Sequence, residues 1–116
     1  PHAIKALVET LQERFADYHK EILFTCIKTK ALGEMLDLLG TLPDTELTLT
    51  HFDDDRATDE EVLKKVAYSR NLNYQSWKEF LDQKMTENEE KKTVRIVTGS
   101  LYFLSQVRAY LMERKN

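Results

Sequence analysis

Residues 94–104 read Val94-Arg95-Ile96-Val97-Thr98-Gly99-Ser100-Leu101-Tyr102-Phe103-Leu104. The β-branched residues at the start of this run favour a short buried strand, and the apolar residues after Ser100 favour an amphipathic helix. Gly99 allows the backbone to turn tightly and lets a ligand approach it, while Ser100 suits the N-cap of the helix. Because free N–H groups at a helix start face any anion bound there, we predict a strand–turn–helix junction with a binding site at residues 98–100.

The first half of the chain alternates predicted helices and strands in the same way. Apolar residues at three- and four-residue steps predict a helix over 3–16, with Pro1 at its first position. A nearly continuous apolar run predicts a buried central strand over 22–27. A second helix is expected over 31–39, ending at Gly40 with Pro43 beyond it.

The second half continues this alternation. Residues 47–50 alternate as in a strand near the sheet edge, and an acidic loop follows at 53–56. Two capping boxes, Thr58 with Glu61 and Ser76 with Glu79, predict helix starts near 59 and 77. A short strand is expected around Leu72 and Tyr74, a solvated connector over 87–92, and a last helix that presents four residues to the sheet: Leu101, Leu104, Val107 and Leu111.

This alternation predicts an α/β fold with a doubly wound, mainly parallel sheet and helices on both faces, Rossmann-like. We expect residues 1–116 to form a single domain, since a chain of this length buries enough surface to fold alone. Ligands gather at the carboxyl ends of such strands. The loops expected to matter are therefore 27–30, 51–56 and 98–100.

Composition argues against several classes of function. A net charge of −3 with interspersed signs predicts no nucleic-acid binding, and without a long apolar run we expect neither a membrane span nor a signal peptide. The single cysteine, Cys26, predicts a buried thiol in a reducing, cytoplasmic compartment. With glycines only at 33, 40 and 99, neither glycine-rich phosphate-binding motif occurs, so we expect no dinucleotide or P-loop nucleotide site in this chain.

No metal site is predicted either. The consecutive carboxylates at 53–55 lack the spacing of a calcium loop, and His19 and His51 have no Cys or His partner at metal-site spacing. Trp77 and Phe80 are expected in the core, although Trp77 also suits an interdomain contact.

Three stretches together resemble the folylpolyglutamate synthase family, also called dihydrofolate synthase, of the Mur ligase superfamily. The run T-G-S-L-Y-F-L-S-Q-V-R at 98–108 is similar to the family's last strand and helix. The run P-H-A-I-K-A-L-V-E-T-L at 1–11 resembles the helix after its D-G-A-H-N motif, and F-T-C-I-K-T-K-A-L at 24–32 resembles the next strand and loop. The resemblance implies a C-terminal domain whose sheet lacks its first strand or strands.

The family resemblance implies an ATP-dependent ligase that adds L-glutamate to the γ-carboxylate of a folate through an acyl phosphate. An N-terminal P-loop domain of the same polypeptide would use ATP and Mg²⁺, while the C-terminal domain holds the amino acid and closes over the site. The isolated chain would then bind neither cofactor, carry no catalytic residue and show no activity.

The residues that match family motifs are few. Thr98, Gly99 and Ser100 match the family's T-G-S and are implied to contact glutamate, although a plain N-cap also explains Ser100. Lys28 and Lys30 lie in a loop where many members read K-D-K-D, here without the acidic residues, and are either solvated or in contact with a ligand or the other domain. The motif's histidine would precede Pro1, so His2 is either a solvated helix-start residue or a further loop contact.

Two other classes of protein remain open. A stand-alone flavodoxin-like binding module would have a complete sheet and bind a small ligand by itself. A protein-interaction module would expose a large apolar patch without a pocket. If the sheet lacks a strand, its exposed edge would also cause artefactual self-association of the isolated chain.

Overall fold

The computed structural model describes residues 2–85 and 89–114. In this part of the chain, all strands are parallel and form one sheet in the order β3-β2-β1-β4. The strands are β1 (His19–Thr25), β2 (Thr45–Leu49), β3 (Asn73–Tyr74) and β4 (Thr93–Gly99). The helices are α1 (His2–Arg14), α2 (Leu32–Leu39), α3 (Glu60–Arg70), α4 (Trp77–Asp82) and α5 (Leu101–Glu113).

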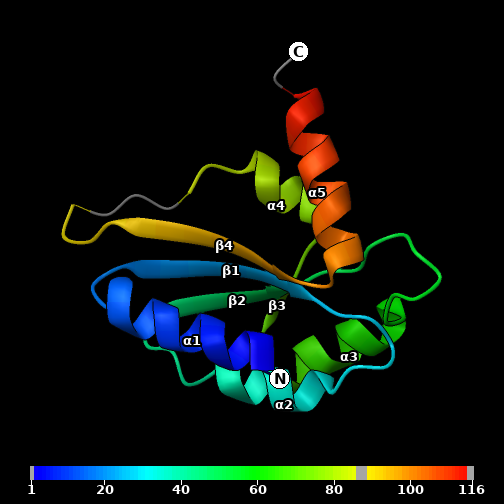
Figure 1. Cartoon of the computed structure of the whole chain (residues 1–116), viewed down its shortest axis with the longest axis horizontal. Helices are drawn as coiled ribbons and strands as arrows, with labels where there is room; N and C mark the ends of the chain where they lie inside the picture. Colours follow the sequence, from blue (N-terminus) through cyan, green and yellow to red (C-terminus); the bar gives the residue numbers. More distant parts are fainter. Residues whose placement is uncertain (1, 86–88, 115–116) are drawn as a thin grey trace.

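The helices cover the sheet from both sides, which confirms the predicted doubly wound α/β fold. Helices α1, α2 and α3 lie on one face of the sheet, and α4 and α5 lie on the other (Figure 1). Two core clusters follow from this arrangement. The first joins α1, α2 and α3 to one face of β1 and β2, and the second joins α4 and α5 to the opposite face.

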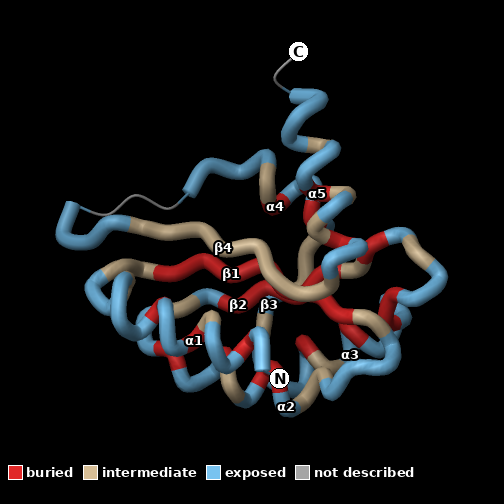
Figure 2. Tube along the Cα trace, in the orientation of Figure 1, coloured by how far each residue is buried: buried red, intermediate tan, exposed pale blue. Residues whose placement is uncertain are grey.

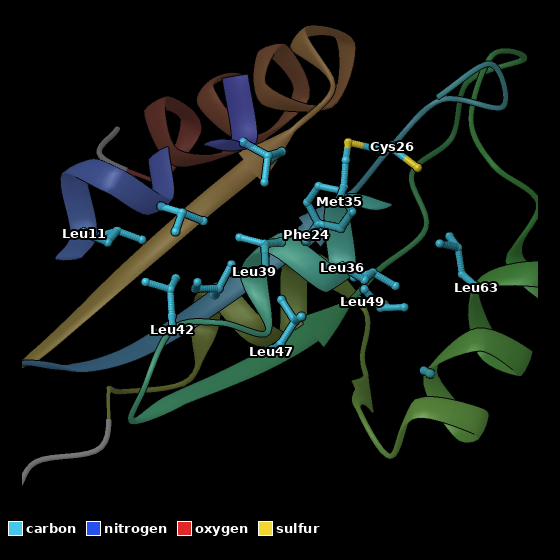
Figure 3. Close-up of a cluster of buried hydrophobic side chains, with 14 residues drawn as sticks. Leu11, Phe24, Cys26, Met35, Leu36, Leu39, Leu42, Leu47, Leu49 and Leu63 are labelled. Atoms are coloured by element: carbon cyan, nitrogen blue, oxygen red, sulfur yellow. The ribbon is translucent and has the colours of Figure 1, made fainter. Parts of the chain in front are cut away.

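Strand β1 occupies the centre of the sheet because its side chains are apolar on both faces of the sheet. Ile22 and Phe24 point into the first cluster and Leu23 into the second, and all three are fully buried. Figure 2 shows β1 as mainly buried and β4 as intermediate along its length. The first cluster includes Leu11 of α1, Leu36 of α2 and Leu63 of α3, which Figure 3 shows around β1 and β2.

The start of β1 differs from the prediction. The strand begins at His19 rather than at residue 22, and it carries the buried charges Lys20 and Glu21 into the sheet. Lys20 Nζ donates to the carbonyl oxygens of Tyr18 at 2.8 Å and Pro43 at 3.0 Å. Because these charged groups have partners inside the fold, they extend a strand that their polarity would otherwise end.

The last helix also faces the sheet differently than expected. Phe103 and Val107 are buried in the second cluster, whereas Leu101 is 80% exposed and Leu111 is 39% exposed. Phe103 packs against Phe52 and Trp77, with ring centroids 5.5 and 5.9 Å apart. These aromatic contacts orient α5, and the prediction that Leu101 and Leu111 face the sheet was wrong.

Neither predicted capping box forms. Asp59 occupies the N-cap position of α3 without a side-chain capping hydrogen bond, and the hydroxyl of Thr58 donates to the carbonyl oxygen of Cys26 at 2.9 Å. Ser76 does occupy the N-cap of α4, but its side chain accepts no capping hydrogen bond. Pro1 and residues 87–88 of the predicted connector lie outside the described residues.

Trp77 and Phe80 lie in the second cluster, with 9% and 6% of their surface exposed, so both are core residues as predicted. None of the described helices has the length and apolar character needed to span a membrane.

Candidate functional site

A cavity of about 380 Å³ opens at the carboxyl edge of the sheet, where α/β proteins place ligands. It lies between the start of α1, the end of β1 and the junction of β4 with α5. Its lining comes from four segments: Ala3 and Ile4 of α1, residues 26, 27 and 30 after β1, Met35 of α2, and residues 98–102.

The structure brings part of the predicted site together. Thr98, Gly99, Ser100 and Lys30 all line the cavity. Lys28 and His2 are not among its lining residues. His2 is exposed at the start of α1, and Lys28 Nζ lies 3.7 Å from a carboxylate oxygen of Asp59. A ligand contact by any of these residues stays a prediction.

Gly99 is required at the end of β4 by its backbone geometry. Its φ angle is +129°, and a Cβ atom there would overlap the carbonyl oxygen of Thr25, its register partner on β1. Only glycine adopts this conformation readily and leaves room for that carbonyl. The glycine therefore lets β4 pair with β1 to its last residue and then turn directly into α5.

Ser100 occupies the N-cap of α5, and its Oγ accepts a hydrogen bond of 3.1 Å from the backbone N–H of Tyr102. The predicted N-cap role is thereby confirmed. The remaining N–H groups of the first turn have no partner within the helix, because the first four N–H groups of any helix lack one.

Two helix starts meet at the cavity. Ala3 in the first turn of α1 and Ser100 at the start of α5 both line it, and neither helix has an acidic residue in its first turn. The N-terminus of a helix carries a partial positive charge. Together with the ammonium group of Lys30, this makes the rim of the cavity suitable for a carboxylate, while Ile27 and Met35 make its wall apolar.

Cys26 lies at the apolar wall and is only 3% exposed, as the sequence predicted. Figure 3 shows it beside Met35 in the first core cluster. Its Sγ is 3.4 Å from the hydroxyl oxygen of Thr58, and burial raises the pKa of the thiol. A protonated, buried thiol is a poor nucleophile, so Cys26 packs rather than reacts.

Sequence reasoning missed Arg56. Residues 53–56 were predicted only as an acidic loop, yet Arg56 forms two side-chain hydrogen bonds of 2.9 Å with Asp54 and lies over the ring of Tyr102. The Asp-x-Arg spacing was the available signal for the pairing with Asp54. Nothing in the sequence indicated that Tyr102 would lie beneath the guanidinium.

A second polar cluster lies at the opposite, amino edge of the sheet. His19, Glu21 and Glu46 each offer a ligand atom within 4.8 Å of the others, a combination of one histidine and two carboxylates that the sequence did not predict. Two of its members already have protein partners: His19 Nδ1 is 2.8 Å from Asp44, and Glu21 pairs with Arg95 at 3.0 Å. We interpret this cluster as an ion-pair network.

The chain matches no family model. It is 30% identical over 111 residues to a Bacillus subtilis protein named dihydrofolate synthase/folylpolyglutamate synthase. That match covers 93% of this chain and 25% of the relative, so the chain spans about a quarter of that protein's length. The fold also matches a crystal structure of Helicobacter pylori folylpolyglutamate synthetase, with a TM-score of 0.64 and 22% identity over all of this chain and 27% of that one.

Proposed function

Since the chain belongs to the folylpolyglutamate synthase family and corresponds to its C-terminal part, we propose that it holds the incoming L-glutamate in an ATP-dependent ligase acting on folates. The observation that carries the proposal is the cavity at residues 98–102, where the starts of α1 and α5 meet beside Lys30. Glutamate carries two carboxylates, and the N–H groups of helix starts bind carboxylates. Thr98, Gly99 and Ser100 are therefore the proposed glutamate contacts.

The proposed reaction joins the amine of glutamate to an activated γ-carboxylate of folate. The amine nitrogen attacks the carbonyl carbon of an acyl phosphate, an amide bond forms, the bond to phosphate breaks, and the amine loses a proton. A domain that holds the carboxylates leaves the amine free and oriented for attack, which lowers the barrier by proximity. Closing over the acyl phosphate also protects it from water.

The sequence of this chain offers no glycine-rich phosphate-binding motif for ATP. Its glycines lie at 33, 40 and 99, so no glycine-rich phosphate-binding loop exists. We therefore assign phosphate chemistry to a P-loop domain elsewhere in the same polypeptide. Leu101 supports a docking surface for that domain, because it lines the cavity and is still 80% exposed.

The topology also gives a place for the strand that the family resemblance implies before α1. Helix α2 connects β1 to β2 on the face of the sheet where α1 also lies. A right-handed connection through α1 into β1 must then come from the other side of β1. Strand β4 occupies that side, so we propose that the additional strand pairs with the outer edge of β4, which pairs with no strand among the described residues.

Glutamate incorporation into folate by the full-length enzyme tests the proposal. We expect Ser100→Ala to raise KM for glutamate about ten- to a hundredfold, the value of a hydrogen bond to a charged group. Ser105→Ala is the matched control, since Ser105 is exposed on the same helix and does not line the cavity. An unchanged KM for Ser100→Ala would exclude Ser100 as a contact, and ATP hydrolysis by the isolated chain would contradict the assignment of phosphate chemistry to another domain.

A further inference from the structure

Arg56 connects the three loops at the carboxyl edge of the sheet. Its Nε and Nη2 each donate to a carboxylate oxygen of Asp54 at 2.9 Å, within the loop after β2. Its backbone oxygen accepts from the N–H of Lys28 at 2.9 Å, in the loop after β1. Its guanidinium carbon lies 3.3 Å from the ring centroid of Tyr102, at the start of α5.

Neighbouring contacts hold the same three loops together. Ile27 and Ala57 form an antiparallel β-bridge, so the loops after β1 and β2 run side by side. The side chain of Gln106 on α5 donates to the backbone oxygen of Asp53 at 2.9 Å. The loop after β2 is thus fixed both to the end of β1 and to the first turns of α5.

Tyr102 links this arrangement to the cavity, because it lines the cavity and its ring stacks against the guanidinium of Arg56. We infer that Arg56 is a positioning residue for the candidate glutamate site: paired with Asp54 and stacked on Tyr102, it fixes the wall of the cavity formed by the start of α5. This inference rests on the proposed function for the identity of the ligand. The contacts among Asp54, Arg56 and Tyr102, which we call the clamp, do not depend on the identity of the ligand.

Arginine suits this position in a way that lysine does not. The planar guanidinium donates two parallel hydrogen bonds to one carboxylate and at the same time stacks on an aromatic face. A lysine ammonium is a point charge on a flexible stem and cannot do both with the same geometry. Arg56→Lys therefore keeps the charge and removes the clamp.

NMR on the 116-residue chain tests the clamp without any ligand. The ring current of Tyr102 should shift the side-chain protons of Arg56 upfield, and Tyr102→Leu should abolish that shift while Tyr102→Phe keeps it. In Arg56→Ala, amide exchange at Tyr102 should accelerate relative to β1 amides such as Ile22. Arg70→Ala is the matched control, because Arg70 likewise pairs with an aspartate, Asp37 at 2.8 Å, and neither of these two residues lines the cavity. Two results would overturn the inference. One is that the side-chain protons of Arg56 show no upfield chemical shift, and the other is that the amide of Tyr102 exchanges at the same rate in Arg56→Ala and Arg70→Ala.

Kinetics of the full-length enzyme test the link to the site. A displaced cavity wall should raise KM for glutamate about ten- to a hundredfold in Arg56→Ala and change kcat little. A purely structural defect would instead lower the amount of active enzyme, hence kcat with KM unchanged. Arg56→Lys should fail to restore KM, and full restoration by lysine would show that charge alone matters. Failure of the wild-type enzyme to incorporate glutamate would reject the proposed function, whereas the NMR result would still decide the clamp.

Discussion

Replacing Gly99 by alanine should destabilise the fold severely, because the added Cβ makes the backbone conformation unfavourable and also overlaps a neighbouring strand. The φ angle of +129° is one that residues with a side chain rarely adopt, which costs on the order of 1–3 kcal/mol. The added Cβ would also overlap the carbonyl oxygen of Thr25 and lie 3.0 Å from its carbonyl carbon. Thr25 belongs to the central strand, so relief requires separating the ends of β1 and β4, an overpacking cost of about 1–3 kcal/mol.

The expected total of about 2–6 kcal/mol is a large part of the stability of a domain, which is roughly 5–15 kcal/mol. Urea unfolding followed by circular dichroism measures it as a lower midpoint. Gly33→Ala is the matched control, because its Cβ would meet only the end of the flexible Arg70 side chain at 3.3 Å within α2. There alanine should be neutral or stabilise by up to about 1 kcal/mol. Equal midpoints for the two variants would refute the argument.

Three further outcomes are expected. Ser100→Ala should lower the stability of the chain by about 1 kcal/mol through loss of the N-cap of α5, and Ser100→Asp should retain most of it, as urea midpoints would show. Cys26 should react with a thiol reagent at pH 8 only in denaturant, since burial raises its pKa; rapid labelling of the folded chain would contradict this. Hydrogen bonds from Arg56 hold the pKa of Asp54 at about 2, below its usual 3.8. The stability that Asp54 contributes is therefore present above pH 4 and lost as the pH falls toward 2, so Asp54→Asn should flatten the acid limb of the stability profile.

Local pattern was enough to predict the sheet and its central strand. The apolar run at 22–27 required burial on both faces, and β1 has it. The β-branched run before Gly99 likewise predicted β4, because the glycine marks the point at which the backbone turns. These features depend on residues close in sequence, so the sequence displays them directly.

Features that depend on distant partners were missed. The polarity of Glu21 placed it outside the predicted strand. In the structure it lies within β1, because it pairs with Arg95, 74 positions away. Helix α5 carries apolar residues on more than one side, and only the aromatic rings of Phe52 and Trp77 select Phe103 over Leu101 for burial. The position of Arg56 over Tyr102 belongs to the same class, since it requires the loop after β2 to reach α5.

The charged groups at the two edges of the sheet are arranged differently, and this difference supports the proposed place of the ligand. At the amino edge, Asp44 accepts from both His19 at 2.8 Å and Lys91 at 2.9 Å, and these bonds lower the pKa of its carboxyl group. The charges there neutralise one another. At the carboxyl edge, α1 and α5 start at a common cavity with no acidic residue in their first turns. A helix start with no acidic residue in its own first turn favours an external anion, so we expect an anionic substrate at this edge.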